Sequence, residues 1–546
     1  MKKRDVLQSP NSRHGVPCYL NQCLFMVLAF LLLALCACSH SYEDNYSFAK
    51  GSLRSIEDCD ALGAAVKARL WEKIKESIND NEKALLDAID SGFKYYGLCY
   101  TGPNYEDGYG SADAGVASTA AQDTAPRPLS ADEYSSTNNQ VAGVDEADFI
   151  KNDGTFIYVL AGNILQILQG WPATDFNVVS ETTIEAMPQK LFVTDTRAVV
   201  LASPEPSCDG QNIDYNNYGA PSDYNPYYSS SGFELFVYDI ENRKAPKLLE
   251  RIEHSGNFVD SRRIANDIHV VLSDASSMLS DIDYYPASLA EAYCDDADQV
   301  SREDVQVAFE RLRRRMHARV YSLVLDEHIP HGTVYRYDGG QQDEGQPLNA
   351  SCQGFYEAPV DSGNDYLSVL SLALDKENAV ASTTIVGGEG EVYSSSESLY
   401  VASVYYEQSD SVALAGTVQS PGYYPGFSGS ESTLVHKLAL SSGAKPAEYR
   451  GSGNVPGRVL NQFSMDEHNG FLRIATTQGY VGSGGDSSNG LYVLEEGADA
   501  TGKVALNVTG SIDGLAKTED IRSVRFDGDR GFVVTFKKPI LCIPLI

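Results

Sequence analysis

The feature that most constrains the fold of this chain is a short unit that recurs from residue 138 to residue 536. Each copy is a β-strand, a polar turn of Asp, Asn, Ser or Gly, and a second strand rich in Val, Ile, Leu and Tyr. Strands joined by such turns predict antiparallel hairpins. The copies are "DFIKNDGTFIYVLAG" (148–162), "KLFVTDTRAVVLAS" (190–203), "SRRIANDIHVVLSD" (261–274), "GEVYSSSESLYVASV" (390–404), "FSMDEHNGFLRIATT" (463–477) and "SVRFDGDRGFVVTF" (523–536).

Candidate outer strands lie between these hairpins, at 233–253, 432–452 and 491–511. A unit of four strands that recurs in this way favours a β-propeller, in which each sheet is buried between its neighbours. We therefore predict a mainly β fold over residues 136–546. We expect about 6–8 four-stranded blades, in a ring that need not be complete. An array of β-sandwiches is the competing interpretation of the same strands.

The N-terminus has the pattern of an export signal. Lys2, Lys3 and Arg4 precede a stretch of sixteen residues without a charge, "CLFMVLAFLLLALCAC", which ends at Cys38. This stretch is short for a membrane span and typical of a signal peptide. Its last four residues resemble a bacterial lipobox, so we expect residues 1–37 to be removed and Cys38 to be lipidated. An uncleaved membrane anchor is the alternative.

The charge balance restricts the partners. The chain has 42 Lys and Arg against 75 Asp and Glu, a net charge of −33. Removal of residues 1–37 takes away four basic residues and one acidic residue, which leaves 38 minus 74, or −36. Such a field repels phosphate backbones and anionic lipid headgroups. We therefore expect no nucleic-acid partner, and an acyl chain that holds the protein on the outer side of the cell membrane.

A helical region of residues 38–100 precedes a flexible linker at 101–135, which is rich in Gly, Ala, Ser, Asp and Pro. Apolar residues at four-residue spacing between 55 and 93 predict an amphipathic helical hairpin or pair of helices. These residues are Leu62, Val66, Leu70, Ile74 and Ile78. Outside the cytoplasm the remaining cysteines can pair. Cys59 with Cys99 is the preferred disulfide, since the two cysteines flank this helical segment.

Two kinds of insertion interrupt the repeats. Residues 301–325 form a predicted helix that begins with a capping box of Ser301 and Asp304. We expect its five arginines between 311 and 319 to neutralise nearby acids rather than form a basic binding patch. The expected apolar positions of the helix are Val305, Val307, Phe309, Leu312 and Met316.

The other insertions, 214–232 and 420–432, are rich in Tyr, Ser, Gly and Asn, which are typical of binding loops and equally of disorder. The candidate binding residues are Tyr215, Tyr218, Tyr227, Tyr228, Tyr423 and Tyr424.

Catalytic and metal motifs are weak. The letters DEAD at 145–148 suggest a helicase, but no GxxxxGK[ST] phosphate loop is present. No GxSxG or HExxH occurs either, and the SxxK match at Ser442 is short enough to arise by chance. His328 and His331 are separated by Pro330, which prevents a helical pair of metal ligands. We therefore predict no catalytic residues and no cofactor, although a structural calcium ion near Asp527 and Asp529 is a weaker hypothesis.

Asp153 and Gly154 form a strong hairpin signal that joins predicted strands at 147–152 and 155–161. The acidic residues just before this hairpin are expected to accept hydrogen bonds from exposed backbone amides. The stretch "SSTNNQVAGVDEADFIKNDGTFIYV" (135–159) resembles the signature of a family of secreted bacterial and archaeal β-propeller-domain proteins, distantly similar to WD-repeat propellers. The positions that carry the resemblance include Asn138, Gln140, Gly143, Asp145, Glu146, Asp148, Lys151, Asp153 and Gly154.

The resemblance extends over residues 54–536 and implies an exported or membrane-anchored propeller, with no established reaction. Members of that family continue with more blade sequence where this chain has "KKPILCIPLI". We therefore expect a product truncated near Lys537.

We predict a binding or scaffold module at the cell surface, whose partner is an extracellular or envelope protein or glycan. The alternative is an envelope hydrolase that acts on peptide or glycan through the propeller channel. Two inward-facing carboxylates about 5–10 Å apart would favour a glycosidase.

Overall fold

The structure is a computed structural model that describes residues 53–91, 139–205, 232–274, 282–289, 300–324, 329–348, 352–357, 365–376, 379–388, 390–407, 430–479, 487–499 and 502–536. The signal peptide, Cys38, Asn138, Cys99, the linker at 101–135, the six tyrosines of the predicted binding loops and the residues after 536 lie outside these ranges. The predictions made for them stay predictions.

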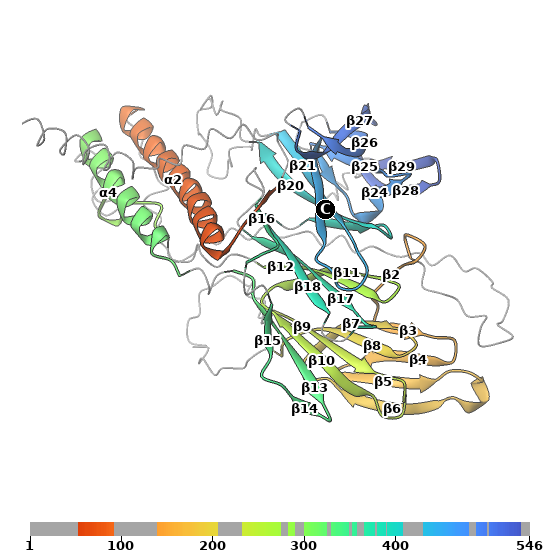
Figure 1. Cartoon of the computed structure of the whole chain (residues 1–546). Coiled ribbons are helices and arrows are strands. Elements are labelled where there is room, and N and C mark those ends of the chain that lie inside the picture. The colour runs from red at the N-terminus through yellow and green to blue at the C-terminus, as the bar shows by residue number, and fades with distance from the viewer. Residues whose placement is uncertain are drawn as a thin grey trace, which may run out of the picture. The chain divides into compact units, whose positions relative to one another are not determined.

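The described strands form six sheets, which are numbered here by the chain order of their first hairpins (Figure 1). The first sheet has the order β3(Ile150–Asn152), β4(Phe156–Ala161), β5(Ile164–Gln169) and β6(Asn177–Thr183). The second contains β7(Met187–Val193), β8(Arg197–Ser203), β9(Phe233–Asp239), β10(Lys247–His254), β13(Gly332–Asp338) and β14(Gln341–Gln342), with β15(Gln346–Leu348) paired to β13. The short 3₁₀ helix η2(Ala173–Asp175) precedes β6.

The third sheet has β11(Asn257–Ile264), β12(Asp267–Asp274), β17(Tyr366–Ala373) and β18(Val380–Val386), extended by β16(Phe355–Glu357) and β1(Arg54–Ser55) at one edge and β2(Val144–Glu146) at the other. The fourth is β19(Glu391–Ser394), β20(Ser398–Glu407), β21(Ser430–Ala439) and β22(Glu448–Pro456). The fifth is β24(Met465–His468), β25(Phe471–Gln478), β26(Ser488–Ala498) and β27(Val504–Leu515), with β23(Arg458–Val459) on β25 and η6(Gln462–Ser464) before β24. The sixth has two strands, β28(Asp520–Asp527) and β29(Arg530–Phe536).

Apolar clusters fill the space between each sheet and the next. Tyr158 and Ile167 of the first sheet, for example, are fully buried against Leu191 and Val200 of the second. Equivalent clusters join the second sheet to the third, the third to the fourth, the fourth to the fifth and the fifth to the sixth. Successive sheets that bury both faces in this way are the architecture of a β-propeller, and the predicted fold class is confirmed.

The helical part differs from the prediction. Residues 55–91, the described part of the predicted segment 55–93, contain one helix, α2(Cys59–Ser91), rather than a hairpin or pair. No Gly or Pro occurs between Ala64 and Ser91, so nothing in the local sequence ends the helix early. Its apolar face packs on the second helix, α4(Arg302–Tyr321), and the two helices lie side by side in Figure 1. The partner of α2 therefore comes from an insertion more than two hundred residues downstream.

Helix α4 begins as the sequence predicts, with the reciprocal capping box of Ser301 and Asp304. Val307 was wrongly assigned to its apolar face, since 44% of this residue is exposed. The arginine side chains pair with acids, as expected: Arg313 with Glu82 of α2 at 2.6 Å, and Arg315 with Asp283 at 2.7 Å.

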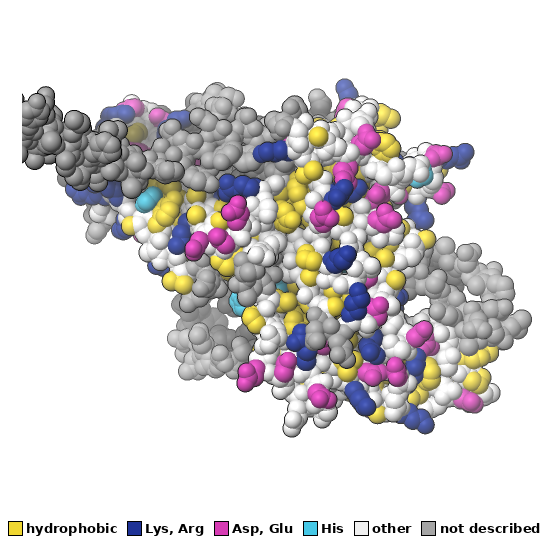
Figure 2. Space-filling model, in the orientation of Figure 1, with side chains coloured by type: hydrophobic (Ala, Val, Ile, Leu, Met, Phe, Trp, Pro, Cys, Tyr) yellow, Lys and Arg dark blue, Asp and Glu magenta, His cyan; other side chains and the backbone are white. Residues whose placement is uncertain are grey.

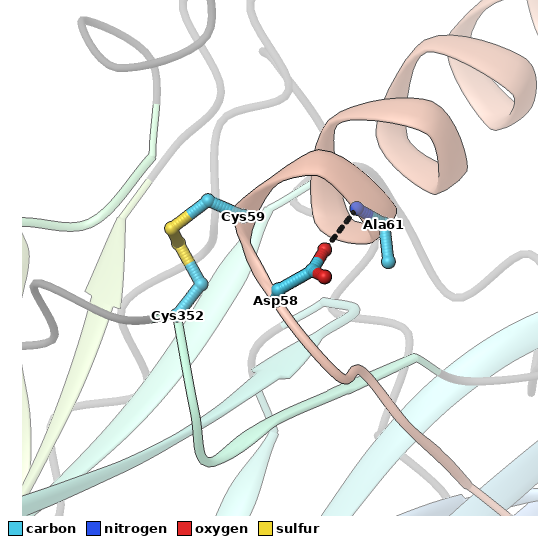
Figure 3. Close-up of a disulfide and its surroundings, with 4 residues drawn as sticks. All are labelled: Asp58, Cys59, Ala61 and Cys352. Atoms are coloured by element: carbon cyan, nitrogen blue, oxygen red, sulfur yellow. Dashed lines mark hydrogen bonds between the residues drawn. A yellow bond between two sulfur atoms is a disulfide. The ribbon is translucent and has the colours of Figure 1, made fainter.

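The predicted Cys59–Cys99 disulfide is wrong, because Cys59 pairs with Cys352 (Figure 3). The cause is the length of α2. A helix of 33 residues is about 50 Å long, whereas the eight residues from Ser91 to Cys99 span at most about 28 Å. Cys99 cannot return to the start of such a helix. The observed disulfide instead fastens the first turn of α2, where Asp58 caps the N–H of Ala61 at 2.8 Å, to the segment just before β16.

Candidate functional site

The signature segment, residues 139–148, contacts four sheets. The Gln140 amide donates to the carbonyl oxygens of Gln462 and Met465, at the start of the fifth sheet, at 3.2 and 3.1 Å. Strand β2 then pairs with β11 of the third sheet, and Asp148 forms a backbone bridge with Leu191 of the second. The chain next enters the first sheet as β3. The segment thus ties together the first, second, third and fifth sheets.

A buried ion-pair network holds this segment in place. The Lys151 ammonium group donates to Asp145 Oδ1 at 2.8 Å and to the carbonyl oxygen of Glu146 at 2.5 Å. Arg263 of β11 donates to the other oxygen of Asp145 at 2.9 and 3.1 Å. Only 6% of Lys151 is exposed. The sequence predicts that Asp145 accepts from backbone amides, but in the structure its carboxylate accepts from the side chains of these two basic residues.

Asp153 organises the hairpin between β3 and β4. Its Oδ1 accepts from the backbone N–H groups of Thr155 and Phe156 at 3.0 and 2.7 Å, and Gly154 takes φ of 89° in the turn. Its Oδ2 accepts from the Tyr158 hydroxyl at 2.8 Å and from Arg243 at 3.3 Å. Burial, followed by the hydrogen bond to Asp153, raises the pKa of Tyr158 above its ordinary value, so the phenol stays neutral. The predicted hairpin is confirmed, with a first strand that begins at Ile150 rather than at 147.

The signature segment and three hairpin turns line an open cleft of about 630 Å³. The turns are those between β3 and β4, between β7 and β8, and between β11 and β12. Asn139 Oδ1 is buried and has no hydrogen-bond partner in the described part of the chain, although its residue lines the cleft. The lining residues are Asn139, Gly143, Asp145, Lys151, Asn152, Asp153, Val193, Thr194, Asp195, Thr196, Arg263, Ala265 and Asn266.

The cleft joins residues that sequence analysis singled out with others that it missed. Gly143, Asp145, Lys151 and Asp153 belong to the signature, whereas Arg263 comes from a later unit, 118 positions from Asp145. The adjacent arginines in "SRRIAND" were the signal from which an acidic partner could have been predicted, because charged residues in an apolar strand usually pair with opposite charges.

A second acidic group lies on the first strands of the third and fourth sheets. Asp260 accepts from Arg262 at 2.6 Å, and Arg262 reaches Gln462 Oε1 at 2.5 Å. Burial, and then the negative charge of Asp260, raise the pKa of Glu391. Glu391 is therefore biased toward its protonated form, and the second carboxyl group, Asp260, is paired with Arg262.

The structure gives no support for a metal site or a membrane-spanning helix within the described ranges. No three His, Cys, Asp or Glu side chains in the described ranges gather into a set that could hold a metal ion. Asp529 contacts His468 at 2.9 Å, and the calcium hypothesis stays a prediction. No helix in the described ranges has the length and apolar character that a membrane span requires.

Comparison with known proteins gives the family. An uncharacterized protein of Archaeoglobus fulgidus is 25% identical over 426 residues, which are 74% of this chain and 60% of that protein. An uncharacterized protein of Methanocaldococcus jannaschii is 24% identical over 458 residues, 80% of this chain and 64% of that protein. This chain therefore spans less than two thirds of the length of either relative.

Two solved structures are similar at low scores. A functionally unknown protein from Desulfotomaculum acetoxidans has a TM-score of 0.21 at 11% identity, over 68% of this chain and 89% of that chain. A hypothetical selenium-binding protein from Sulfolobus tokodaii has a TM-score of 0.23 at 11% identity, over 69% of this chain and 68% of that chain. The family described as Beta propeller domain matches residues 134–540, more than half of the sequence, and this chain belongs to that family.

Proposed function

We propose that this protein is a lipid-anchored binding module on the outer side of the bacterial cell membrane, and that its ligand binds in the cleft of the signature segment. The observation that carries the proposal is the composition of the cleft. It combines part-buried charges of both signs with three asparagine side chains, one of which has a buried oxygen without a described partner. Such groups fix the orientation of a ligand by hydrogen bonds.

The charged groups of the cleft favour binding over catalysis. Asp145 is neutralised by Lys151 and Arg263, and Asp153 by Arg243. None of these three pairs leaves its carboxylate free to act as a general base. The asparagines at 139, 152 and 266 and the threonines at 194 and 196 can instead pair with amides or hydroxyl groups. A segment of an envelope protein or glycan presents both.

The proposal is tested by removing two cleft amides in the variant Asn152→Ala/Asn266→Ala. We expect a 10- to 100-fold loss of affinity, because two hydrogen bonds contribute about 1–3 kcal/mol. The measurement is binding of the labelled protein to arrays of envelope oligosaccharides and peptides, followed by titration of the best probe. Gln341→Ala, an exposed amide on β14 outside the cleft, is the matched control. Equal binding by all three proteins would place the ligand elsewhere.

The anchor is proposed from the sequence of the N-terminus. Cells that express the full chain should incorporate radioactive palmitate into it, and Cys38→Ala should abolish the label because the acceptor thiol is lost. The label and the membrane fraction of the protein are measured together. Labelling of the Cys38→Ala variant would contradict lipidation at this residue.

A second candidate is a glycan hydrolase, favoured by the pair of Glu391 and Asp260. A buried carboxyl group of raised pKa near a second carboxyl group is the arrangement of a general acid with its partner. The release of reducing sugars from cell-wall glycan by the purified protein measures this activity. If it is present, Glu391→Gln should lower the rate by at least 100-fold, since general acid catalysis contributes about 10²–10⁴-fold. No release by the wild-type protein would reject this candidate.

A further inference from the structure

A second pocket lies where three strands of the second sheet begin or end. It has a volume of about 330 Å³ and is lined by the first residues of β9, the last residues of β10 and the first residues of β13. None of its lining residues also lines the cleft of the signature segment, so the two sites are separate. The lining includes Gly232, Glu234, Glu253, His254, Ser255 and Gly332.

His254 supplies a hydrogen-bond donor in this pocket. The residue is only 4% exposed. Burial, and then the charge of His331, lower its pKa to about 4, so the ring is neutral at pH 7. Its Nδ1 accepts from the backbone N–H of Gly256 at 2.9 Å, which places the proton of the neutral ring on Nε2. Nε2 is buried and has no hydrogen-bond partner among the described residues. A buried N–H without a partner is unfavourable, and in a pocket such a group fixes the orientation of a ligand.

The residue beside His254 leaves the edge of the ring open to the pocket. Gly332 of β13 lies directly opposite His254 of β10, and opposite residues project to the same side of a sheet. A Cβ atom at position 332 would lie 3.2 Å from Cδ2 of His254, the carbon bonded to Nε2. Both residues line the pocket. No side chain of residue 332 therefore stands between the pocket and the edge of the ring that carries Nε2.

The pocket adjoins one of the insertions that the sequence singles out as a candidate for binding. Gly232, the last residue of the insertion 214–232, lines the pocket, and so does Pro204, which follows β8. The chain therefore leaves the second sheet and returns to it beside the pocket. Residues 206–231 lie outside the described ranges, and the site is defined by described residues alone.

The charges around the pocket favour an uncharged ligand. Glu234 and Glu253 are in the lining, and Arg251 pairs with both, at 3.1 and 2.8 Å. The hydroxyl group of Ser255, also in the lining, donates to Asp274. Three carboxyl groups against one arginine disfavour an anion, and an unused N–H donor disfavours a cation. Figure 2 shows acidic side chains spread over the visible face of the sheets, so the wider surface does not attract anions either.

We propose that this pocket is a second binding site, and that it holds one uncharged, sugar-sized group whose oxygen accepts from the Nε2–H of His254. Hydroxyl and amide carbonyl oxygens are acceptors of this kind. The volume is at the lower end of the range for ligand pockets, which suits a single sugar ring of about 12–15 non-hydrogen atoms. A ligand of this size binds with a dissociation constant of about 1 mM. The site lies beyond the proposed ligand of the cleft, because the two share no residue.

The test is ligand-observed NMR of the full chain with Cys38→Ser, with N-acetylglucosamine and glucose as probes at about 0.1–20 mM. His254→Asn keeps an acceptor for the N–H of Gly256 but lacks the Nε2–H, so it should bind about 3- to 10-fold more weakly. His254→Gln carries an N–H near the position of Nε2 and should bind more tightly than His254→Asn. The matched control is His468→Asn, a histidine outside the pocket, which should leave the affinity unchanged. Binding of N-acetylglucosamine alone would identify a carbonyl acceptor, and binding of both sugars a hydroxyl acceptor.

Three outcomes would overturn the proposal. No binding of either sugar at about 20 mM would show that the pocket does not take such a group. Equal affinity of His254→Asn and the wild type would show that Nε2 does not contact the ligand. Affinity lost in Asn152→Ala/Asn266→Ala but kept in His254→Asn would place the sugar in the cleft of the signature segment. Thermal unfolding of each variant confirms that the fold is intact. Gly332 is not varied, because a Cβ atom there would lie 2.6 Å from the carbonyl oxygen of Glu253.

Discussion

Protonation of three histidines that are buried in neutral form should lower the free energy of unfolding by about 6 kcal/mol between pH 7.5 and pH 5. Burial, together with the charge of His331, lowers the pKa of His254 to about 4. Burial likewise lowers the pKa values of His269 and His436 to about 4. The imidazole rings of His269 and His436 contact the hydroxyl groups of Ser371 and Ser452, at 2.9 and 2.6 Å.

The direction of this change in stability with pH follows from proton linkage. In the unfolded chain these histidines bind a proton below their ordinary pKa of 6.5, whereas in the folded chain they do so only near pH 4. The unfolded state therefore binds more protons between these values, and stability is lost as the pH falls through this window. At pH 5 each histidine accounts for about 2 kcal/mol, and below pH 4 for about 3 kcal/mol.

Urea unfolding at half-unit steps of pH measures this effect. Glu234 and Asp274 have pKa values raised mainly by burial, so they favour the folded state as the pH falls and oppose the histidines. The comparison of His436→Gln with the wild type isolates one histidine from these carboxyl groups. The variant should lose about 2 kcal/mol less than the wild type between pH 7.5 and pH 5. Equal pH dependence of the two proteins would contradict the prediction.

Lys151→Met should destabilise the protein by about 3–5 kcal/mol, because it removes one member of a buried ion-pair network. Asp145 would keep Arg263, but its Oδ1 would lose the Lys151 ammonium at 2.8 Å, and so would the carbonyl oxygen of Glu146 at 2.5 Å. The signature segment would then be held less firmly against the first strands. Chemical denaturation measures the change in the free energy of unfolding. It is done at pH 7.5, above the pH range in which the buried histidines affect stability.

The matched control is Lys247→Met, which removes an exposed lysine from β10. A surface change of this kind should alter stability by about 0.5 kcal/mol or less. The double variant Lys151→Met/Asp145→Asn should cost less than the sum of its single variants, since the two side chains interact directly. A Lys151→Met variant as stable as the control would show that the network does not hold the segment.

The cleft could be predicted in part. Gly143, Asp145, Lys151 and Asp153 were chosen as signature residues, and the structure brings all four into its lining. Their partners Arg263 and Arg243 were not chosen, because they lie 118 and 90 positions away and no local pattern connects them. The six tyrosines of the predicted binding loops lie outside the described residues, so their role stays a prediction.

The sequence by itself determined the local elements. Alternation of apolar and polar residues, the turn at Asp153 and Gly154, and the capping box of Ser301 depend on neighbours within a few positions, and the structure has each of them. Only the tertiary structure decided which elements meet. The pairing of Cys59 with Cys352, the docking of α2 on α4 and the ion pair of Asp145 with Arg263 join residues more than a hundred positions apart. Such contacts depend on how the sheets stack. Burial of apolar surface is non-directional, so the sequence pattern of one element does not specify which distant element it will pack against.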